Sequence, residues 1–466
     1  MVQIILVIAT LIVLATGWLL LFGGSALTVL VENDSSTVWT ALAVLVLLVV
    51  LGGLVDETTM SLHPFYRRRL ASAFAVRAVR MKGNHVVAEP YRHSERTTLS
   101  TYGQLANSAR KKFPQVIFAA SATLGDRRTP PGSNRVSYTF SGNWVGGPDI
   151  GYVRTAKLPE CASQRLQRDL TVQGAVALSG AALAASAGAQ NSKWYETLFA
   201  VTGVRLGAWM PNPLFVLDNW GGNHEWFTPE IPKVRRLSYL LRELIGIHPS
   251  NGPLLQVTDG GFYDNLGLLE LFRRKCTQIY CIDASGDSPP PATTLASVLT
   301  LAYQELGVTV ELDGTAFDNT PGTGLPEKPQ DALTTLNPRL AKSGIITGKI
   351  SYPAESGLPS GRRRQGLLVV AKASLWPGLP YPLLAYATNN PTFPNDSTAD
   401  QWFDDGQYAA YTSLGRELGR AAYEEMQKLA GSNAPIHSPA KNLPDDTGAQ
   451  RKGSIRARDR SGARRL

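Results

Sequence analysis

Cysteine is scarce in this sequence, and no residues have the spacing of metal ligands. The 466 residues include three cysteines, Cys161, Cys276 and Cys281, which are too few for a disulfide framework. The six histidines are scattered, with no H-x-x-x-H pair. We therefore predict free thiols, as in a reducing compartment, and no metal site.

Acidic residues are few near the C-terminus. Residues 433–466 hold eight Lys or Arg against three Asp, which supplies +5 of the formal net charge of +9. Large apolar residues are almost absent from this stretch, so it buries too little surface to offset its ordering entropy. We predict a disordered basic tail over residues 431–466. A solvated tail, which could touch anionic lipid, is favoured over nucleic-acid binding, since runs of like charge are usually solvated. Without the tail the rest of the chain is only mildly basic.

Charge is missing altogether from two apolar runs, residues 2–22 and 38–55. Each is about long enough to cross a bilayer, and the first lacks the basic start and cleavage site of a signal peptide. They predict a transmembrane hairpin over residues 1–56. Arginines between residues 67 and 80 follow the second run, which favours a cytoplasmic position for both ends. The expected localisation is the inner (cytoplasmic) membrane, with two spans and a cytoplasmic soluble domain.

Residues 57–112 are predicted to be a basic, membrane-proximal linker. Aromatic and aliphatic residues alternate with arginines there, as in a helix that lies along lipid headgroups. An ordinary solvated connector helix fits the same pattern, and both interpretations remain open.

The remaining body, residues 113–430, has the alternation of an α/β domain. A strand over 254–258, a helix over 265–275 and a strand over 278–283 predict a βαβ unit with parallel pairing. Residues 345–353 and 365–374 predict a hairpin, and a long helix follows near the C-terminus. We expect an open, mainly parallel sheet with flanking helices.

Asp259 lies between the first strand and the helix of this unit, directly before Gly260 and Gly261. Carboxyl ends of parallel strands collect reactive groups, and a carboxylate there can act as general base for a serine. An aspartate that caps a turn or a helix is the common use of Asp-Gly, and composition alone favours this interpretation.

Several segments between about residues 61 and 421 resemble the patatin-like phospholipases, specifically the C-terminal portion of the large bacterial membrane-associated type. These segments are "SLHPFYRRRL" (61–70), "AVALSGAALAASAG" (175–188), "VRLGAWMPNP" (204–213), "TDGGFYDNLGLLELFRRKC" (258–276) and "TADQWFDDGQYAAYTSLG" (398–415). The resemblance implies a patatin-like fold and makes Asp259 the base of a Ser-Asp dyad, with Gly260, Gly261 and Asn265 as supporting motif. It also implies an acyl-enzyme reaction without metal or organic cofactor.

The nucleophile of such an enzyme is missing from this sequence. No serine has glycine at both −2 and +2, as the G-x-S-x-G elbow requires. Ser179 with Asp259 would make a self-sufficient hydrolase, but Ala177 and Ala181 take the strained elbow geometry less freely than glycine. Asp283, Ser285 and Asp287 end a predicted strand and are further candidates for lining the same cleft.

The expected function is a membrane-anchored patatin-like lipid acyl hydrolase represented by its aspartate-bearing half. Its expected partners are membrane lipid and a serine-bearing patatin half, with no nucleic acid. The alternative is a catalytically inactive, membrane-associated homologue that binds lipid or protein.

Overall fold

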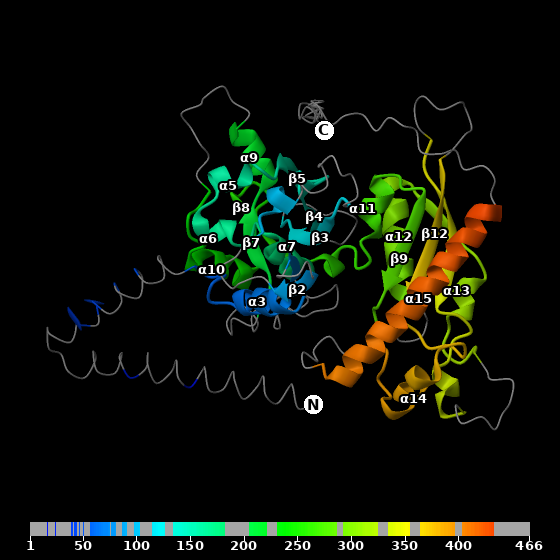
Figure 1. Cartoon of the computed structure of the whole chain (residues 1–466). Helices are drawn as coiled ribbons and strands as arrows, with labels where there is room; N and C mark the ends of the chain where they lie inside the picture. Colours follow the sequence, from blue (N-terminus) through cyan, green and yellow to red (C-terminus); the bar gives the residue numbers. More distant parts are fainter. Residues whose placement is uncertain are drawn as a thin grey trace, which may run out of the picture.

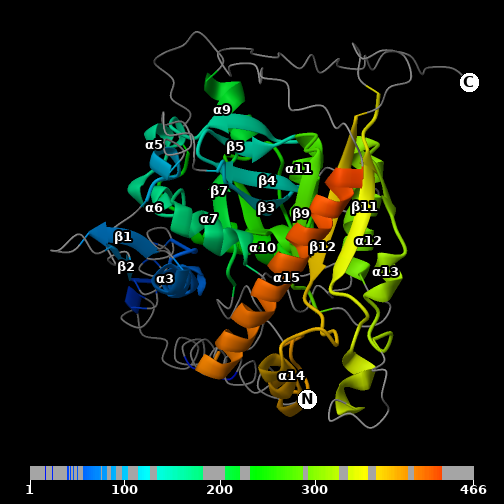
Figure 2. The ribbon, with the colours of Figure 1, turned by 45° about the vertical axis from the view of Figure 1, so that its right-hand side comes forward.

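The computed structural model describes most of the chain from residue 56 to residue 432. The described ranges are 56–74, 76–80, 86–90, 97–102, 114–125, 134–181, 205–220, 231–286, 292–324, 334–354, 364–396 and 403–432, with isolated positions before residue 56. Two sheets with their helices lie side by side in both ribbon views (Figures 1 and 2). The predicted basic tail lies outside the described residues, apart from the last residues of a helix that ends at Ser432.

The first sheet has six strands in the order β6-β5-β4-β3-β8-β7, and every neighbouring pair is antiparallel. Its strands are β3 (Ile117–Thr123), β4 (Arg135–Ser141), β5 (Trp144–Gly147), β6 (Gly151–Arg154), β7 (Ala208–Pro211) and β8 (Leu254–Asp259). The expectation of a mainly parallel, patatin-like sheet is therefore wrong. A short, largely apolar run such as residues 254–258 indicates a strand that is buried on both faces. It does not indicate whether that strand runs parallel or antiparallel to its neighbours.

Helices and a small two-stranded sheet accompany the first sheet. They are α3 (His63–Phe74), β1 (Val76–Arg80), β2 (Val86–Pro90), α5 (Leu158–Cys161), α6 (Gln164–Gln167), α7 (Val172–Ser179), α9 (Pro213–Trp220) and α10 (Leu237–Ile245). The side chain of Thr171 caps α7 by accepting a hydrogen bond from the Gly174 N–H at 3.1 Å. α7 packs on β3 and β8, and α3 packs on α7. The basic segment predicted as a linker thus includes a helix in contact with the α/β body.

The second sheet has four strands in the order β10-β11-β12-β9. Its strands are β9 (Gln278–Asp283), β10 (Thr309–Leu312), β11 (Ile345–Ser351) and β12 (Gln365–Lys372). β11 and β12 form the predicted hairpin, whereas β12 and β9 are parallel. The helices of this part are α11 (Leu268–Arg273), α12 (Thr293–Leu306), α13 (Thr315–Asp318), η2 (Thr334–Arg339), α14 (Tyr381–Asn389) and α15 (Asp405–Ser432). The short helix η1 (Gly260–Phe262) follows β8 and contacts β3, β4 and α7 of the first part.

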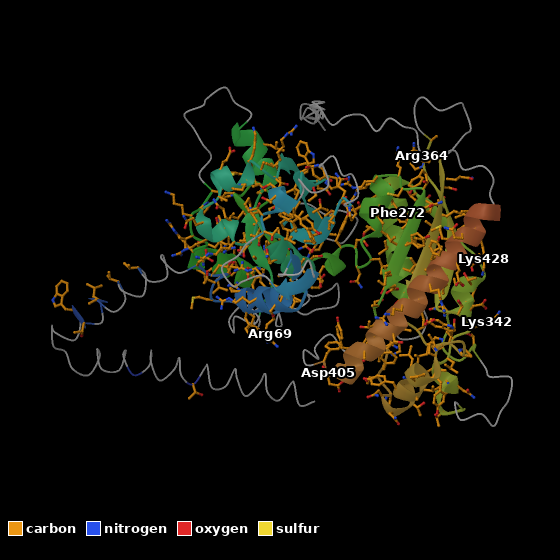
Figure 3. All side chains as sticks on the ribbon, in the orientation of Figure 1. Arg69, Phe272, Lys342, Arg364, Asp405 and Lys428 are labelled. Atoms are coloured by element: carbon orange, nitrogen blue, oxygen red, sulfur yellow. The ribbon has the colours of Figure 1, made fainter. Side chains whose placement is uncertain are left out.

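Alternate residues of β12 give the second sheet two apolar faces. Leu367, Val369 and Ala371 pack in one cluster with residues of α14 and α15. Leu368 and Val370 pack in another cluster with residues of α11 and α12. The long helix α15 crosses the sheet from Asp405 near one end to Lys428 near the other (Figure 3).

The strand–helix–strand unit forms as predicted, but its two strands do not pair. β8 lies between β3 and β7 in the first sheet, and β9 lies at the edge of the second. The helix α11 between them packs its fully buried Phe272 in the cluster that covers the second sheet. The predicted parallel pairing of these strands is wrong, because short-range order of elements does not determine which edges meet.

No helix in the described part of the chain combines the length and the apolar character that a bilayer crossing requires. This finding contradicts the predicted two-span hairpin and the inner-membrane localisation that followed from it. The two apolar runs on which the prediction rested, residues 2–22 and 38–55, lie outside the described residues except for isolated positions.

Candidate functional site

Asp259 ends β8 at a turn that requires glycine at the next residue. A Cβ atom on Gly260 would lie 2.6 Å from the carbonyl oxygen of Ala119 on β3, closer than real contacts allow. A Cβ atom on Gly261 would lie 2.5 Å from Oδ1 of Asn265. The predicted motif residues Asp259, Gly260, Gly261 and Asn265 are therefore brought together in one compact turn.

The Asp259 carboxylate is half-buried and has one oxygen fixed. Oδ1 accepts a hydrogen bond from the Gly261 N–H at 2.8 Å, which makes Asp259 the cap of η1. Among the described residues, no donor is bonded to Oδ2. Burial raises the pKa of Asp259, and the Gly261 N–H lowers it in part. The carboxylate combines the capping role with one oxygen open to a further proton donor.

Ser179, the other predicted catalytic residue, lies close to this turn but has a different partner. It is the last residue of α7, and its hydroxyl donates to the Ala119 carbonyl oxygen at 2.6 Å. This is the same oxygen that leaves no room for a Cβ atom on Gly260. The structure has no hydrogen bond between Ser179 and the Asp259 carboxylate, so the two are neighbours without forming a dyad.

The surroundings of Ser179 do not favour an oxyanion. The N–H groups of Gly180 and Ala181 both donate to carbonyl oxygens of α7, and that of Gly261 donates to Asp259. Ser179 also stands at the C-terminal end of its helix, where the helix dipole disfavours negative charge.

Tyr66 joins this region and was missed as a site residue. Its hydroxyl donates to the Gly180 carbonyl oxygen at 2.9 Å. Burial raises the pKa of Tyr66, and the negative charge of Asp259 raises it further, which places the phenol within electrostatic range of the carboxylate. Tyr66 lies far from Asp259 in the sequence, so no spacing rule connects the two residues.

Buried ion pairs hold α3 and the segment before it against the body. Asp169 contacts Arg67, Arg235 at 2.7 Å and His63 Nε2 at 3.3 Å. Burial alone would raise the pKa of Asp169, but Arg235, His63 and Arg67 hold it well below its usual range. Arg235 also contacts Asp56 at 3.0 Å. These contacts fix the position of Tyr66 on α3.

A second buried group of charges lies beside the first. Arg205 contacts both Glu57 and Glu243, and Trp209 Nε1 donates to Glu243 at 2.7 Å. Burial and the neighbouring Glu243 raise the pKa of Glu57 to about 7. The sequence carries no signal for either network, because the partners come from separate segments.

A small pocket opens next to the Asp259 turn. Its lining includes Ser137, Gly260, Tyr263, Asp264, Glu270 and Arg273. The Ser137 hydroxyl donates to Glu270 at 2.9 Å, and Arg273 donates to Tyr263 at 2.7 Å and to Glu305 at 2.8 Å. The charges of this pocket are thus compensated within the protein.

Asp283 and Ser285, which were predicted to line the same cleft as Asp259, lie at the end of β9 in the other sheet, and Asp287 lies outside the described residues. Lys372 of β12 joins Asp283 and Ser285, and it too was missed. A lone lysine at the end of the apolar run "GLLVVA" was the available signal. Among the described residues, no group of three or more His, Cys, Asp and Glu is arranged to hold a metal ion.

Scans of this chain against protein-family models, curated proteins and solved structures found no match.

Proposed function

We propose that this chain supplies the general base of a serine-type acyl hydrolase, with Asp259 as that base. The observation that carries the proposal is the asymmetry of the carboxylate: Oδ1 is fixed by the Gly261 N–H, and Oδ2 has no donor among the described residues. A carboxylate held in this way keeps its orientation while it accepts a proton from an incoming hydroxyl. The likeness of residues 258–276 to the aspartate motif of patatin-like phospholipases supports the same role.

The nucleophilic serine and the oxyanion hole come, in this proposal, from a separate serine-bearing polypeptide of the patatin type. Ser179 donates to Ala119 instead of Asp259, and the nearby N–H groups of Gly180, Ala181 and Gly261 are already bonded. A tetrahedral intermediate at this position would lack hydrogen-bond donors from those groups.

The chemistry of Asp259 follows from its environment. A raised pKa brings the carboxyl nearer to the working pH, where a general base is most effective. Asp259 takes the proton of the serine hydroxyl as the oxygen attacks an acyl ester, and returns it to the leaving alcohol. In the second half of the cycle it takes a proton from the water that hydrolyses the acyl-enzyme.

A non-catalytic binding role is the second candidate. It is favoured by the capping bond of Asp259, which is the ordinary structural use of an aspartate before glycine. The two candidates differ in whether the Asp259 carboxylate is needed for turnover.

Reconstitution separates the two candidates. The chain is mixed with a polypeptide that carries a patatin-type glycine-rich loop and G-x-S-x-G elbow, and hydrolysis of p-nitrophenyl butyrate is followed. We expect turnover above the sum of the separate components, and a loss of about 10²- to 10⁴-fold with Asp259→Asn. Asp405→Asn, on the exposed first turn of α15, is the matched control and keeps full activity. A mixture without added activity, or one indifferent to Asp259→Asn, rejects the catalytic proposal.

A further inference from the structure

The carboxyl ends of the two parallel strands bring three reactive side chains together. β9 ends at Asp283 and β12 ends at Lys372, and these two residues are register partners. Both are almost completely buried, with 1% and 4% of their surface exposed. Ser285 follows Asp283 by two residues and is partly exposed, between exposed Ala284 and Gly286. Carboxyl ends of parallel strands are the usual position of reactive groups in α/β proteins.

The Ser285 hydroxyl lies between a carboxylate and an ammonium group. It donates to Asp283 Oδ1 at 2.5 Å, and it accepts from Lys372 Nζ at 3.1 Å. Lys372 Nζ also lies 3.3 Å from Asp283 Oδ2 and donates to the Ser285 carbonyl oxygen at 2.5 Å. A short bond from a hydroxyl to an ionised group is among the stronger hydrogen bonds in proteins. The serine therefore has a base within reach and a cation next to its oxygen.

The first turn of α12 borders the same hydroxyl. Thr294 Oγ1 lies 3.1 Å from Ser285 Oγ, and α12 runs for 14 residues from Thr293. Its N-cap residue, Ala292, makes no side-chain hydrogen bond to the helix. Because Thr294 lies in the first turn, Ser285 is near the positive end of the helix dipole, which favours the negative charge that develops during a nucleophilic attack.

A purely structural turn does not require this arrangement. The bond from the Ser285 N–H to Asp283 Oδ1 at 2.9 Å is sufficient to shape the turn. Burying a lysine and an aspartate costs solvation that an apolar pair would avoid. Asp283 Oδ2 is buried, and the Lys372 ammonium at 3.3 Å compensates its charge. The buried ion pair thus goes beyond what the turn needs.

We propose that Ser285 is a nucleophile toward small carboxylic esters, with Asp283 as its base and Lys372 and the start of α12 stabilising the oxyanion. Ser285 Oγ bonds to the acyl carbon while its proton passes to Asp283. The ester C–O bond then breaks, and the leaving alcohol takes that proton. Water attacks the acyl-serine, gives a proton to Asp283, and releases the acid as Ser285 regains its hydrogen. The overall reaction consumes ester and water and yields acid and alcohol, with no redox change.

The test uses the full chain alone, with a fluorophosphonate probe and p-nitrophenyl acetate as the ligands. We expect covalent labelling at Ser285, located by mass mapping of the labelled peptide, together with slow release of p-nitrophenol. Ser285→Ala abolishes both signals, and Asp283→Asn and Lys372→Met lower the labelling rate at least tenfold. Ser297→Ala is the matched control, because Ser297 is an exposed serine of α12 that donates only to the Thr293 carbonyl oxygen.

Ser285→Cys is a second test, in case Ser285→Ala loses its signals because it misfolds. It keeps the shape of the site, and its thiol should react with iodoacetamide faster than the partly buried Cys276. Labelling that is absent from the folded wild-type chain, or that maps to another serine, overturns the proposal. The result is separable from the role of Asp259, because no serine-bearing partner is added here.

Discussion

Arg235 and Asp169 form a buried ion pair, with Nη1 2.7 Å from Oδ2 and both side chains at most 3% exposed. Arg235 also contacts Asp56, and Asp169 also contacts Arg67 of α3. One ion-pair network therefore ties the segment before α3, the helix itself and the loop before α7. The position of Tyr66 beside Gly180 depends on this arrangement.

Replacing Asp169 by alanine should leave buried arginines without compensation. We expect a loss of about 3–5 kcal/mol in the free energy of unfolding, because removing one partner of a buried pair exposes the other to its full desolvation cost. Urea unfolding at neutral pH measures the change. Lys342→Ala is the control, since this side chain is 66% exposed in its pair with Asp318 and its removal should cost under about 1 kcal/mol. Equal effects of the two variants would contradict the role given to the network.

The pH dependence of stability should contain a contribution from Glu57. Burial and Glu243 raise its pKa from 4.5 to about 7, so the folded state holds this proton more tightly than the unfolded state. Its contribution is fully present below about pH 4.5 and is lost as the pH rises through about 7. The loss should be on the order of 3 kcal/mol over this window. Urea unfolding at pH 5 and pH 8 should show a smaller difference for Glu57→Gln than for the wild type.

Gly260→Ala tests the close approach of the Asp259 turn to β3. The new methyl group would lie 2.6 Å from the Ala119 carbonyl oxygen, and backbone must move to admit it. We expect a loss of about 1–3 kcal/mol by thermal or urea unfolding. Gly415→Ala in α15 is the matched control, because nothing lies within 4 Å of the added atom. That substitution should stabilise the protein by about 0.5–1 kcal/mol, since alanine is the better helix former. A neutral Gly260→Ala would show that the turn is looser than described.

The two faces of β9 should respond differently to truncation of apolar residues. Phe272 of α11 is 1% exposed and packs in the apolar cluster on one face of β9. Ile282 of β9 itself lies on the other face and is 76% exposed. Phe272→Ala should cost about 3–5 kcal/mol in unfolding free energy. Ile282→Ala should change it by no more than about 0.5 kcal/mol. A large cost at Ile282 would mean that this face of β9 is covered in solution.

Much of the element order could be predicted from the sequence, because periodicity and glycine placement are local properties. The strand predicted at 278–283, the hairpin predicted at 345–353 and 365–374 and the C-terminal helix correspond to β9, to β11 and β12, and to α15. The direction and pairing of β8 were not predicted correctly, since a strand buried along most of its length looks the same whether its neighbours run parallel or antiparallel.

The candidate site was predictable only where its residues are close in sequence. The turn from Asp259 to Asn265 is a local motif, and its two glycines indicate a tight turn of the backbone. Tyr66 reaches the same region through α3, and Lys372 reaches Ser285 through the pairing of β12 with β9. Contacts of this kind arise from tertiary packing and leave no periodic pattern in the sequence.

Ser179→Ala tests whether the nucleophilic serine comes from a partner polypeptide, as proposed, or is Ser179 of this chain. The hydroxyl donates only to the Ala119 carbonyl oxygen, so its removal should cost about 1 kcal/mol of stability. In the reconstituted mixture it should leave p-nitrophenyl butyrate hydrolysis unchanged if, as proposed, the nucleophile comes from the partner polypeptide. Thermal unfolding and initial rates measured on the same preparation separate the two effects. If the variant stays folded but the Asp259-dependent activity disappears, Ser179 is the nucleophile, and its bond to Ala119 must exchange for one to Asp259 during the reaction.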